Sequence, residues 1–193
     1  MPPLFRLLFI SLLLAWGLPA RAVDVAGVNF APQIELGGSK LQLNGAGVRY
    51  KAVFKVYAAG LYVDRKISSL EELIKAPGPK RMSITMLRDI NTDELGKLFS
   101  RGMEDNMDRA AFAKLIPGIL RMSQIFSNYK KLNAGEDFTL DWLPGKGLVL
   151  SVKGEVQGAP FREPEFFAAM MAIWLGHSPA DWKLKNELLD LKS

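Results

Sequence analysis

The chain has 193 residues, with 25 Lys and Arg, 20 Asp and Glu, one histidine and no cysteine, so its formal net charge is +5 at pH 7. The absence of cysteine excludes disulfides, thiol catalysis and thiolate metal sites. The excess of basic residues is small and dispersed, and it does not indicate a nucleic-acid partner.

The first 22 residues have the three parts of a secretory signal peptide. Arg6 provides a positive start, Leu7 to Trp16 is apolar, and Ala20-Arg21-Ala22 matches an A-x-A cleavage site. The apolar run is shorter than the roughly 20 residues of a spanning helix, so an uncleaved membrane anchor is the weaker alternative. Removing Arg6 and Arg21 leaves 23 basic and 20 acidic residues, a net charge of +3. We expect residues 23–193 to form one exported, monomeric domain without a transmembrane segment.

Strand patterns dominate the first half of this domain. Ile34 to Leu36 and Leu41 to Leu43 alternate apolar and polar residues around Gly37-Gly38-Ser39, which predicts a hairpin. The remaining elements predicted in this half are a long strand pair over 48–63, a short helix over 67–75 and a strand over 81–87.

Helices dominate the second half. Asn91 is the predicted N-cap of a helix to about Asn106, with Glu94 at its third position as in a capping box. The next helix begins near Asp108 and is expected to be interrupted at Pro117-Gly118 before it continues to residue 129. The other predicted elements are a hairpin over 137–153 and two closing helices over 164–175 and 179–191, each opening on a proline. This order predicts an α+β fold with a mainly antiparallel sheet.

The segment from Gly45 to Val63 is the most informative for function. It carries Arg49, followed by aromatic residues that include Tyr57 and Tyr62. In one unbroken strand, Arg49 and Tyr57 would share a face, whereas a bend near Ala52 or Val53 would change that phase. A guanidinium group offers a planar fork of donors and a phenol adds another. Such a pair could hold a carboxylate or an enolate oxygen.

The same segment resembles the chalcone isomerase family. Gly45-Ala46-Gly47-Val48-Arg49 matches a G-x-G-x-R turn of the family, and Ala58-Ala59-Gly60-Leu61-Tyr62 matches its small-residue G-x-Tyr signature. Residues 172–179 and 184–189 resemble the C-terminal segment of proteins in the secreted bacterial branch of the family. The resemblance covers nearly all of the chain after the signal peptide. It implies an open-faced β-sandwich, in which a large antiparallel sheet is covered on one face by helices and the cleft lies between the two layers.

Two kinds of function follow from this resemblance. In the true isomerases of the family, an arginine holds the oxyanion of the substrate, and a threonine, a tyrosine and an asparagine complete the site. Arg49 matches the arginine, but Tyr57, Leu95 and Gly102 stand at the other three positions. Non-catalytic relatives of the family bind fatty acids in the same cleft, with an arginine and a tyrosine for the carboxylate. This chain is more similar to them.

We therefore predict a binding protein for a small acidic apolar ligand such as a fatty acid, without a cofactor or metal. Its predicted ligand-binding residues are Arg49 with Tyr57 or Tyr62. The first alternative is an isomerase or intramolecular lyase in which Arg49 stabilises an enolate, Tyr57 is the acid or base, and Asn91 or Asn106 replaces a missing polar group. The second is a structural partner of an envelope complex, with the cleft closed by side chains and Arg49 paired to a nearby acid.

His177, the only histidine, falls in a loop before a helix, without the Ser and Asp partners of a triad. A loop or cap role is the better interpretation, and a lone histidine does not indicate a metal site.

Cleavage after Ala22 is expected to give a mature protein that begins at Val23. N-terminal sequencing of the protein recovered from the periplasm or the medium tests this. A mature form that still carries Leu7 to Trp16 would show that the apolar run is a retained anchor.

Overall fold

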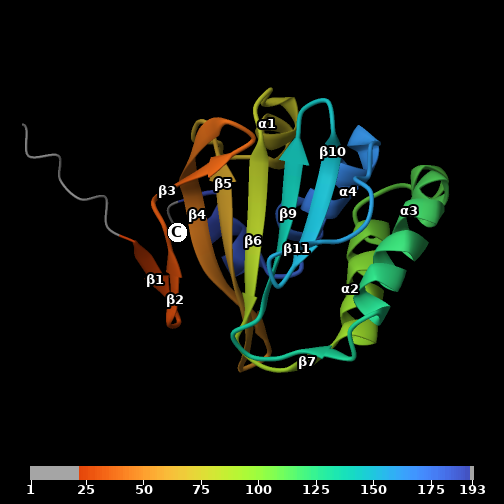
Figure 1. Ribbon diagram of the computed structural model, residues 1–193, viewed down its shortest axis with the longest axis horizontal. Helices are drawn as coiled ribbons and strands as arrows, with labels where there is room; N and C mark the ends of the chain where they lie inside the picture. The colour runs from red at the N-terminus through yellow and green to blue at the C-terminus, as the bar shows by residue number, and fades with distance from the viewer. Residues whose placement is uncertain (1–21, 192–193) are drawn as a thin grey trace, which may run out of the picture.

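The computed structural model describes residues 22–191, so the predicted signal peptide lies outside the described residues except for Ala22. Seven antiparallel strands form one large sheet (Figure 1). Their order across the sheet is β11 (Glu155–Val156), β10 (Gly147–Val152), β9 (Asp137–Leu143), β6 (Lys80–Met86), β5 (Phe54–Val63), β4 (Ser39–Lys51) and β3 (Gln33–Leu36). Two small antiparallel strand pairs lie beside it: β1 (Val23–Val25) with β2 (Val28–Phe30), and β7 (Ile90–Asn91) with β8 (Lys131–Leu132).

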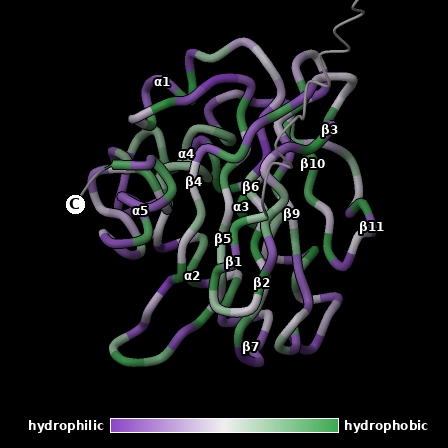
Figure 2. Tube along the Cα trace, turned by 90° about the vertical axis from the view of Figure 1, so that its left-hand side faces the viewer, coloured by the Kyte–Doolittle hydropathy of each residue, from purple (hydrophilic) through white to green (hydrophobic). Residues whose placement is uncertain are grey.

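Five helices complete the described chain: α1 (Leu70–Lys75), α2 (Thr92–Glu104), α3 (Arg109–Ser127), α4 (Pro164–Leu175) and α5 (Trp182–Leu188). Figure 2 shows α2, α4 and α5 on one side of the sheet. On the opposite face, Phe30 of β2 packs with Leu41, Ala58 and Tyr62 in a small second cluster. The predicted α+β open-faced sandwich is confirmed. Among residues 22–191, no helix is long and apolar enough to cross a membrane.

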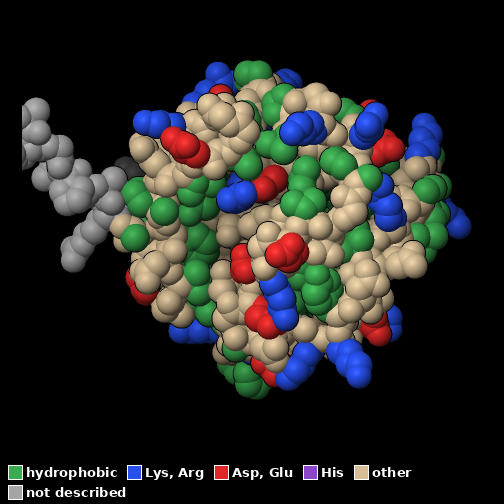
Figure 3. All heavy atoms as spheres, viewed as in Figure 1, with side chains coloured by type: hydrophobic (Ala, Val, Ile, Leu, Met, Phe, Trp, Pro, Cys, Tyr) green, Lys and Arg blue, Asp and Glu red, His purple; other side chains and the backbone are tan. Residues whose placement is uncertain are grey.

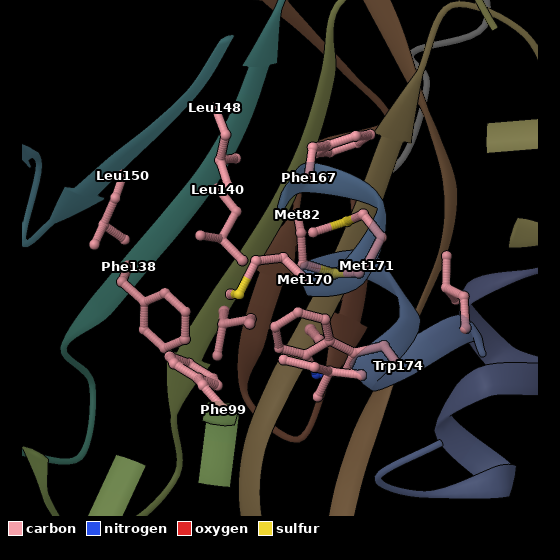
Figure 4. Close-up of a cluster of buried hydrophobic side chains, with 14 of the residues drawn as sticks. Met82, Phe99, Phe138, Leu140, Leu148, Leu150, Phe167, Met170, Met171 and Trp174 are labelled. Carbon is pink, nitrogen blue, oxygen red and sulfur yellow. The ribbon is translucent and has the colours of Figure 1, made fainter. Parts of the chain in front are cut away.

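The main core lies between the sheet and the helices. Met82, Ile84 and Met86 of β6 are buried, whereas the residues between them are only partly buried, as expected for a strand with one face against a core. Helix α4 is buried along almost its whole length, from Phe166 to Leu175. Figure 4 shows its side chains, among them Trp174, packed against Phe99 of α2 and the core-facing residues of β6, β9 and β10.

The structure corrects two of the predicted helices. α3 runs without interruption through Pro117, because the buried stripe of Leu115, Ile119, Met122 and Phe126 holds the helix together across the hydrogen bond that the proline removes. The last helix begins at Trp182 rather than at the proline of residue 179. Its N-cap is Asp181, whose Oδ1 accepts hydrogen bonds from the backbone N–H groups of residues 183 and 184.

The segment with the family signatures is a hairpin with a two-residue turn. β4 ends at Lys51, the chain reverses through Ala52-Val53, and β5 begins at Phe54. The segment from Arg49 to Tyr57 is therefore not one continuous strand, and the alternative with a bend near Ala52 or Val53 is confirmed.

Candidate functional site

A cavity of about 260 Å³ lies between the end of the β4–β5 hairpin and the helical layer. One wall comes from Arg49, Val56 and Tyr57 of the hairpin. The remaining lining residues are Ile90, Leu95, Leu98, Phe99, Arg101, Gly102 and Asp105 on the α2 side, and Ile173, Ser178, Pro179 and Ala180 from the end of α4 and the connection to α5. Most of this surface is apolar, and two arginines and one aspartate supply its charge.

Arg49 and Tyr57 line the same cavity because they are direct cross-strand partners. The register of β4 and β5 shifts between Arg49 and Tyr50, so that Tyr50 pairs with Lys55 and Val56 is the extra residue of a bulge. Directly opposed residues of an antiparallel pair project from the same face. The Arg49 guanidinium carbon consequently lies 5.7 Å from the centroid of the Tyr57 ring.

No ion pair within residues 22–191 includes Arg49. Arg81 lies on β6, which is separated from β4 by β5, and it behaves differently: its Nε and Nη2 each donate to Asp141, at 2.6 Å. Arg101, which lines the cavity from α2, also has no acid within 4 Å among the described residues. The cavity thus contains guanidinium donors that the described chain does not neutralise.

The Tyr57 hydroxyl is held by the helical layer. Tyr57 is buried, and its oxygen accepts a hydrogen bond from Trp174 Nε1 at 2.7 Å. Burial raises the pKa of Tyr57 to about 12, although the positive charge of Arg49 and the hydrogen bond from Trp174 oppose the shift. The phenol therefore stays protonated at neutral pH. It keeps its own O–H as a donor, and it is poorly suited to act as a base.

Tyr62 lies on the opposite face of the sheet. It packs with Phe30, Leu41 and Ala58 under the β1–β2 pair and does not line the cavity. Tyr62 is five positions after Tyr57 on β5, an odd offset, and alternation along the strand sends the two rings to opposite faces. Of the two tyrosines proposed as partners of Arg49, the geometry brings only Tyr57 to it.

The α2 wall has apolar atoms at the two positions where the resemblance to the isomerases implies polar side chains. Leu95 and Gly102 both line the cavity. Gly102 leaves room for α4, since a Cβ at this position would lie 3.0 Å from Ile173 Cγ2. Asn91 does not replace the missing groups, because its Oδ1 caps α2 at Asp93 N, 2.8 Å away.

The side chain of Asn106 is likewise occupied by hydrogen bonds to the backbone. Its Nδ2 donates to Gly102 O and Ser178 O, both at 2.8 Å, and its Oδ1 accepts from Ser178 N at 2.9 Å. These bonds tie the end of α2 to the connection after α4. His177 is exposed in that connection and does not line the cavity. Residues 22–191 contain no group of three or more side chains placed to hold a metal ion.

Arg101 and Asp105 are the charged cavity residues that the sequence patterns did not predict. The spacing of Leu95, Leu98, Phe99 and Gly102 on the predicted helix marks one helical face, and Arg101 lies at the edge of this face. Charged residues at such an edge are usually solvated, and only the position of the β4–β5 hairpin shows that Arg101 borders a cavity.

The comparisons with known proteins agree with this architecture. A family model described as chalcone isomerase-like matches residues 22–190, and the chain belongs to that family. Among solved structures, the crystal structure of a fatty-acid binding protein of Arabidopsis thaliana (AtFAP1) is similar, with a TM-score of 0.70 and 17% sequence identity over 85% of this chain and 92% of that chain. At this identity the similarity concerns the fold. No curated protein matches the sequence.

The raised pKa of Tyr57 predicts a loss of stability at alkaline pH. The unfolded chain ionises this phenol near 10.0 and the folded chain near 12, so the stabilisation is complete below pH 10 and is lost as the pH rises to about 12. Two pKa units correspond to about 2–3 kcal/mol of unfolding free energy. Urea unfolding of the wild type and of Tyr57→Phe across this range isolates the contribution, because all other groups are shared. A difference between the two proteins that does not change with pH would contradict the assignment.

Proposed function

We propose that the protein is exported and that the cavity beside Arg49 binds a small acidic apolar ligand, such as a fatty acid. The observation that carries this proposal is the Arg49 guanidinium, which borders an apolar cavity next to a protonated phenol and has no acidic partner among the described residues. Arg49 is partly buried, and a guanidinium with reduced access to water is stabilised by a counter-charge. A ligand carboxylate would supply that charge.

The arrangement of donors fits a carboxylate head group. Arg49 can donate two parallel N–H bonds to the two oxygens, which fixes the orientation of the group as well as stabilising it. Tyr57 can add its O–H, and the hydrogen bond from Trp174 Nε1 to the Tyr57 oxygen polarises this donor. Arg101 on the opposite wall adds further positive charge.

The remaining lining fits the apolar part of such a ligand. Val56, Ile90, Leu95, Leu98 and Ile173 present aliphatic side chains to the cavity, and Phe99 presents a ring. The similar plant structure is that of a fatty-acid binding protein. This similarity supports the same ligand class for the present member of the family.

The isomerase alternative has weaker support from the same residues. An efficient general acid or base needs a pKa near the operating pH, and the pKa of Tyr57 is raised to about 12. The α2 wall offers Leu95 and Gly102, neither of which has a side-chain hydrogen-bond donor. What remains for enolate chemistry is Arg49 as an electrostatic stabiliser.

Replacing Arg49 is expected to weaken ligand binding much more than folding. Arg49→Met keeps most of the aliphatic volume but leaves the carboxylate without its partner, so the free energy of laurate binding should fall by about 2–5 kcal/mol. Arg49→Lys keeps the charge without the planar fork and should recover only part of the affinity. Calorimetric titration with laurate, with thermal melting of each variant, measures both effects.

The matched control is Arg65→Met, which makes the same replacement at an exposed position outside the cavity. It should bind laurate as the wild type does. If Arg49→Met binds laurate equally well, or fails to fold, Arg49 is a structural residue and the binding function loses its main support.

We also expect no useful cyclisation of a hydroxychalcone to a flavanone. The loss of one preorganised donor commonly lowers a rate by about 10²–10³-fold, and several polar positions of the isomerases are replaced in this cavity. Stopped-flow absorbance with a hydroxychalcone measures the rate. Saturable cyclisation well above the background rate and lost in Arg49→Met would favour the isomerase instead.

A further inference from the structure

The turn at the end of the site hairpin has an unusual composition. Four hairpins among residues 22–191 have two-residue turns, and three of these turns contain glycine: Ala26-Gly27, Gly37-Gly38 and Lys153-Gly154. The fourth, Ala52-Val53, contains none, although Ala52 has a φ of +54°. Turns of this kind favour Gly, Asn and Asp, because these residues tolerate a positive φ and expose no apolar side chain to solvent. Local turn chemistry therefore does not explain the two apolar residues.

The turn also exposes large apolar side chains to solvent. Val53 is 81% exposed, the highest value among the large hydrophobic residues of the described chain, and the adjacent Phe54 is 61% exposed. Figure 1 places the β4–β5 turn at the lower end of the sheet, and Figure 3 shows a hydrophobic projection at this edge with basic side chains near it. Two adjacent, protruding apolar side chains are more stable in contact with an apolar environment than in water.

Basic side chains surround this projection. Lys51 and Lys55 flank the apolar residues in sequence, and the guanidinium carbon of Arg88 lies 5.9 Å from the centroid of the Phe54 ring. Lys51 has one weak ion pair, 3.5 Å from Glu94, in which both side chains are more than half exposed. Lys55 and Arg88 take part in no ion pair with any other residue of 22–191.

The projection belongs to the same hairpin that forms a wall of the cavity. Arg49 lies three residues before the turn and Tyr57 four residues after it, and Val56, between the turn and Tyr57, also lines the cavity. A surface that takes up the turn would therefore lie close to the cavity.

We propose that this tip, formed by residues 51–55 and Arg88, docks on a bilayer surface that contains anionic phospholipid. Val53 and Phe54 enter the interface between head groups and acyl chains, and the three basic residues contact lipid phosphates. A hydrophobic tip with surrounding positive charge is complementary to such a surface, and the small overall charge of the chain means that the contact depends on this local cluster. The docking goes beyond ligand binding in the cavity and does not require it.

Vesicle sedimentation with the mature chain, without added fatty acid, tests the proposal. The probe is vesicles of phosphatidylglycerol and phosphatidylcholine in equal parts, compared with vesicles of phosphatidylcholine alone. Val53→Asp should weaken binding to the mixed vesicles by about tenfold or more, since it removes an inserted side chain and adds a repelled charge. Val156→Asp is the matched control, because Val156 lies on β11 and is 62% exposed. It should bind as the wild type does.

A charge reversal tests the basic residues separately. Each basic residue near an anionic surface contributes about a fivefold change in partitioning, so Lys55→Glu should weaken binding by about 25-fold. Lys146→Glu, at an exposed position in the β9–β10 turn, should have little effect. Both pairs of variants replace exposed residues, and melting curves confirm that each one is folded.

Insertion can be observed directly because the chain has no cysteine. Val53→Cys labelled with an environment-sensitive dye should show a blue shift and brighter emission on mixed vesicles, and Val156→Cys with the same dye should not. Arg49→Met should bind mixed vesicles as the wild type does. Loss of laurate binding in the cavity can therefore be distinguished from loss of vesicle binding by the tip. The proposal is overturned if the wild type does not bind mixed vesicles, if Val53→Asp binds as tightly as Val156→Asp, or if the dye at residue 53 stays in water. Either of the last two results would show that the tip does not insert into the bilayer.

Discussion

The site depends on the register of one hairpin. With a turn at Ala52-Val53 and regular pairing beyond it, Arg49 would face Val56, and Tyr57 would be opposite Val48. The bulge shifts the pairing by one residue and makes Arg49 and Tyr57 direct partners. Because side chains alternate between the faces of a strand, a shift of one residue decides which face each of them occupies. The bulge therefore brings a guanidinium and a phenol together at the cavity, although eight positions separate them in sequence.

The polar part of the site is anchored in the apolar core. Trp174 of α4 donates to the Tyr57 hydroxyl, and its ring lies 6.0 Å from that of Phe99, centroid to centroid, in an edge-to-face arrangement. Phe99 also lines the cavity. The orientation of the phenol is thus fixed by the same packing that joins the helices to the sheet, and a donor held in this way loses little freedom when a ligand binds.

Arg49 and Arg81, on the two strands that flank β5, show how the fold distinguishes a paired cation from an unpaired one. Arg81 makes a two-pronged contact with the buried carboxylate of Asp141, the cross-strand partner on β9, so its charge is satisfied within the sheet. Arg49 has Tyr57 as its cross-strand partner, and a phenol that stays protonated does not neutralise it. The identity of one cross-strand residue therefore separates a stabilising ion pair from a guanidinium that has no ion pair among residues 22–191.

The sequence alone determined the elements whose signals are local. The glycine turn at residues 37–38, the Asn91 cap and the alternation of Met82, Ile84 and Met86 each act within a few residues, and the matching elements are present. The order of strands and helices, with the signatures around Arg49 and Tyr62, was sufficient to predict the open-faced sandwich and the family. The continuity of α3 through Pro117 was decided by tertiary packing, because buried contacts along one face of a helix outweigh one lost hydrogen bond.

The composition of the site also required the tertiary structure. Sequence proximity made Tyr57 and Tyr62 equal candidates, and only the bulge and the alternation along β5 separated them. Arg101 lies 52 positions from Arg49, and the two line one cavity because α2 packs over the end of the hairpin. A sequence pattern reports the face of a single element, whereas a cavity is made by the faces of several elements that meet, and their relative placement is set by the packing of the whole core.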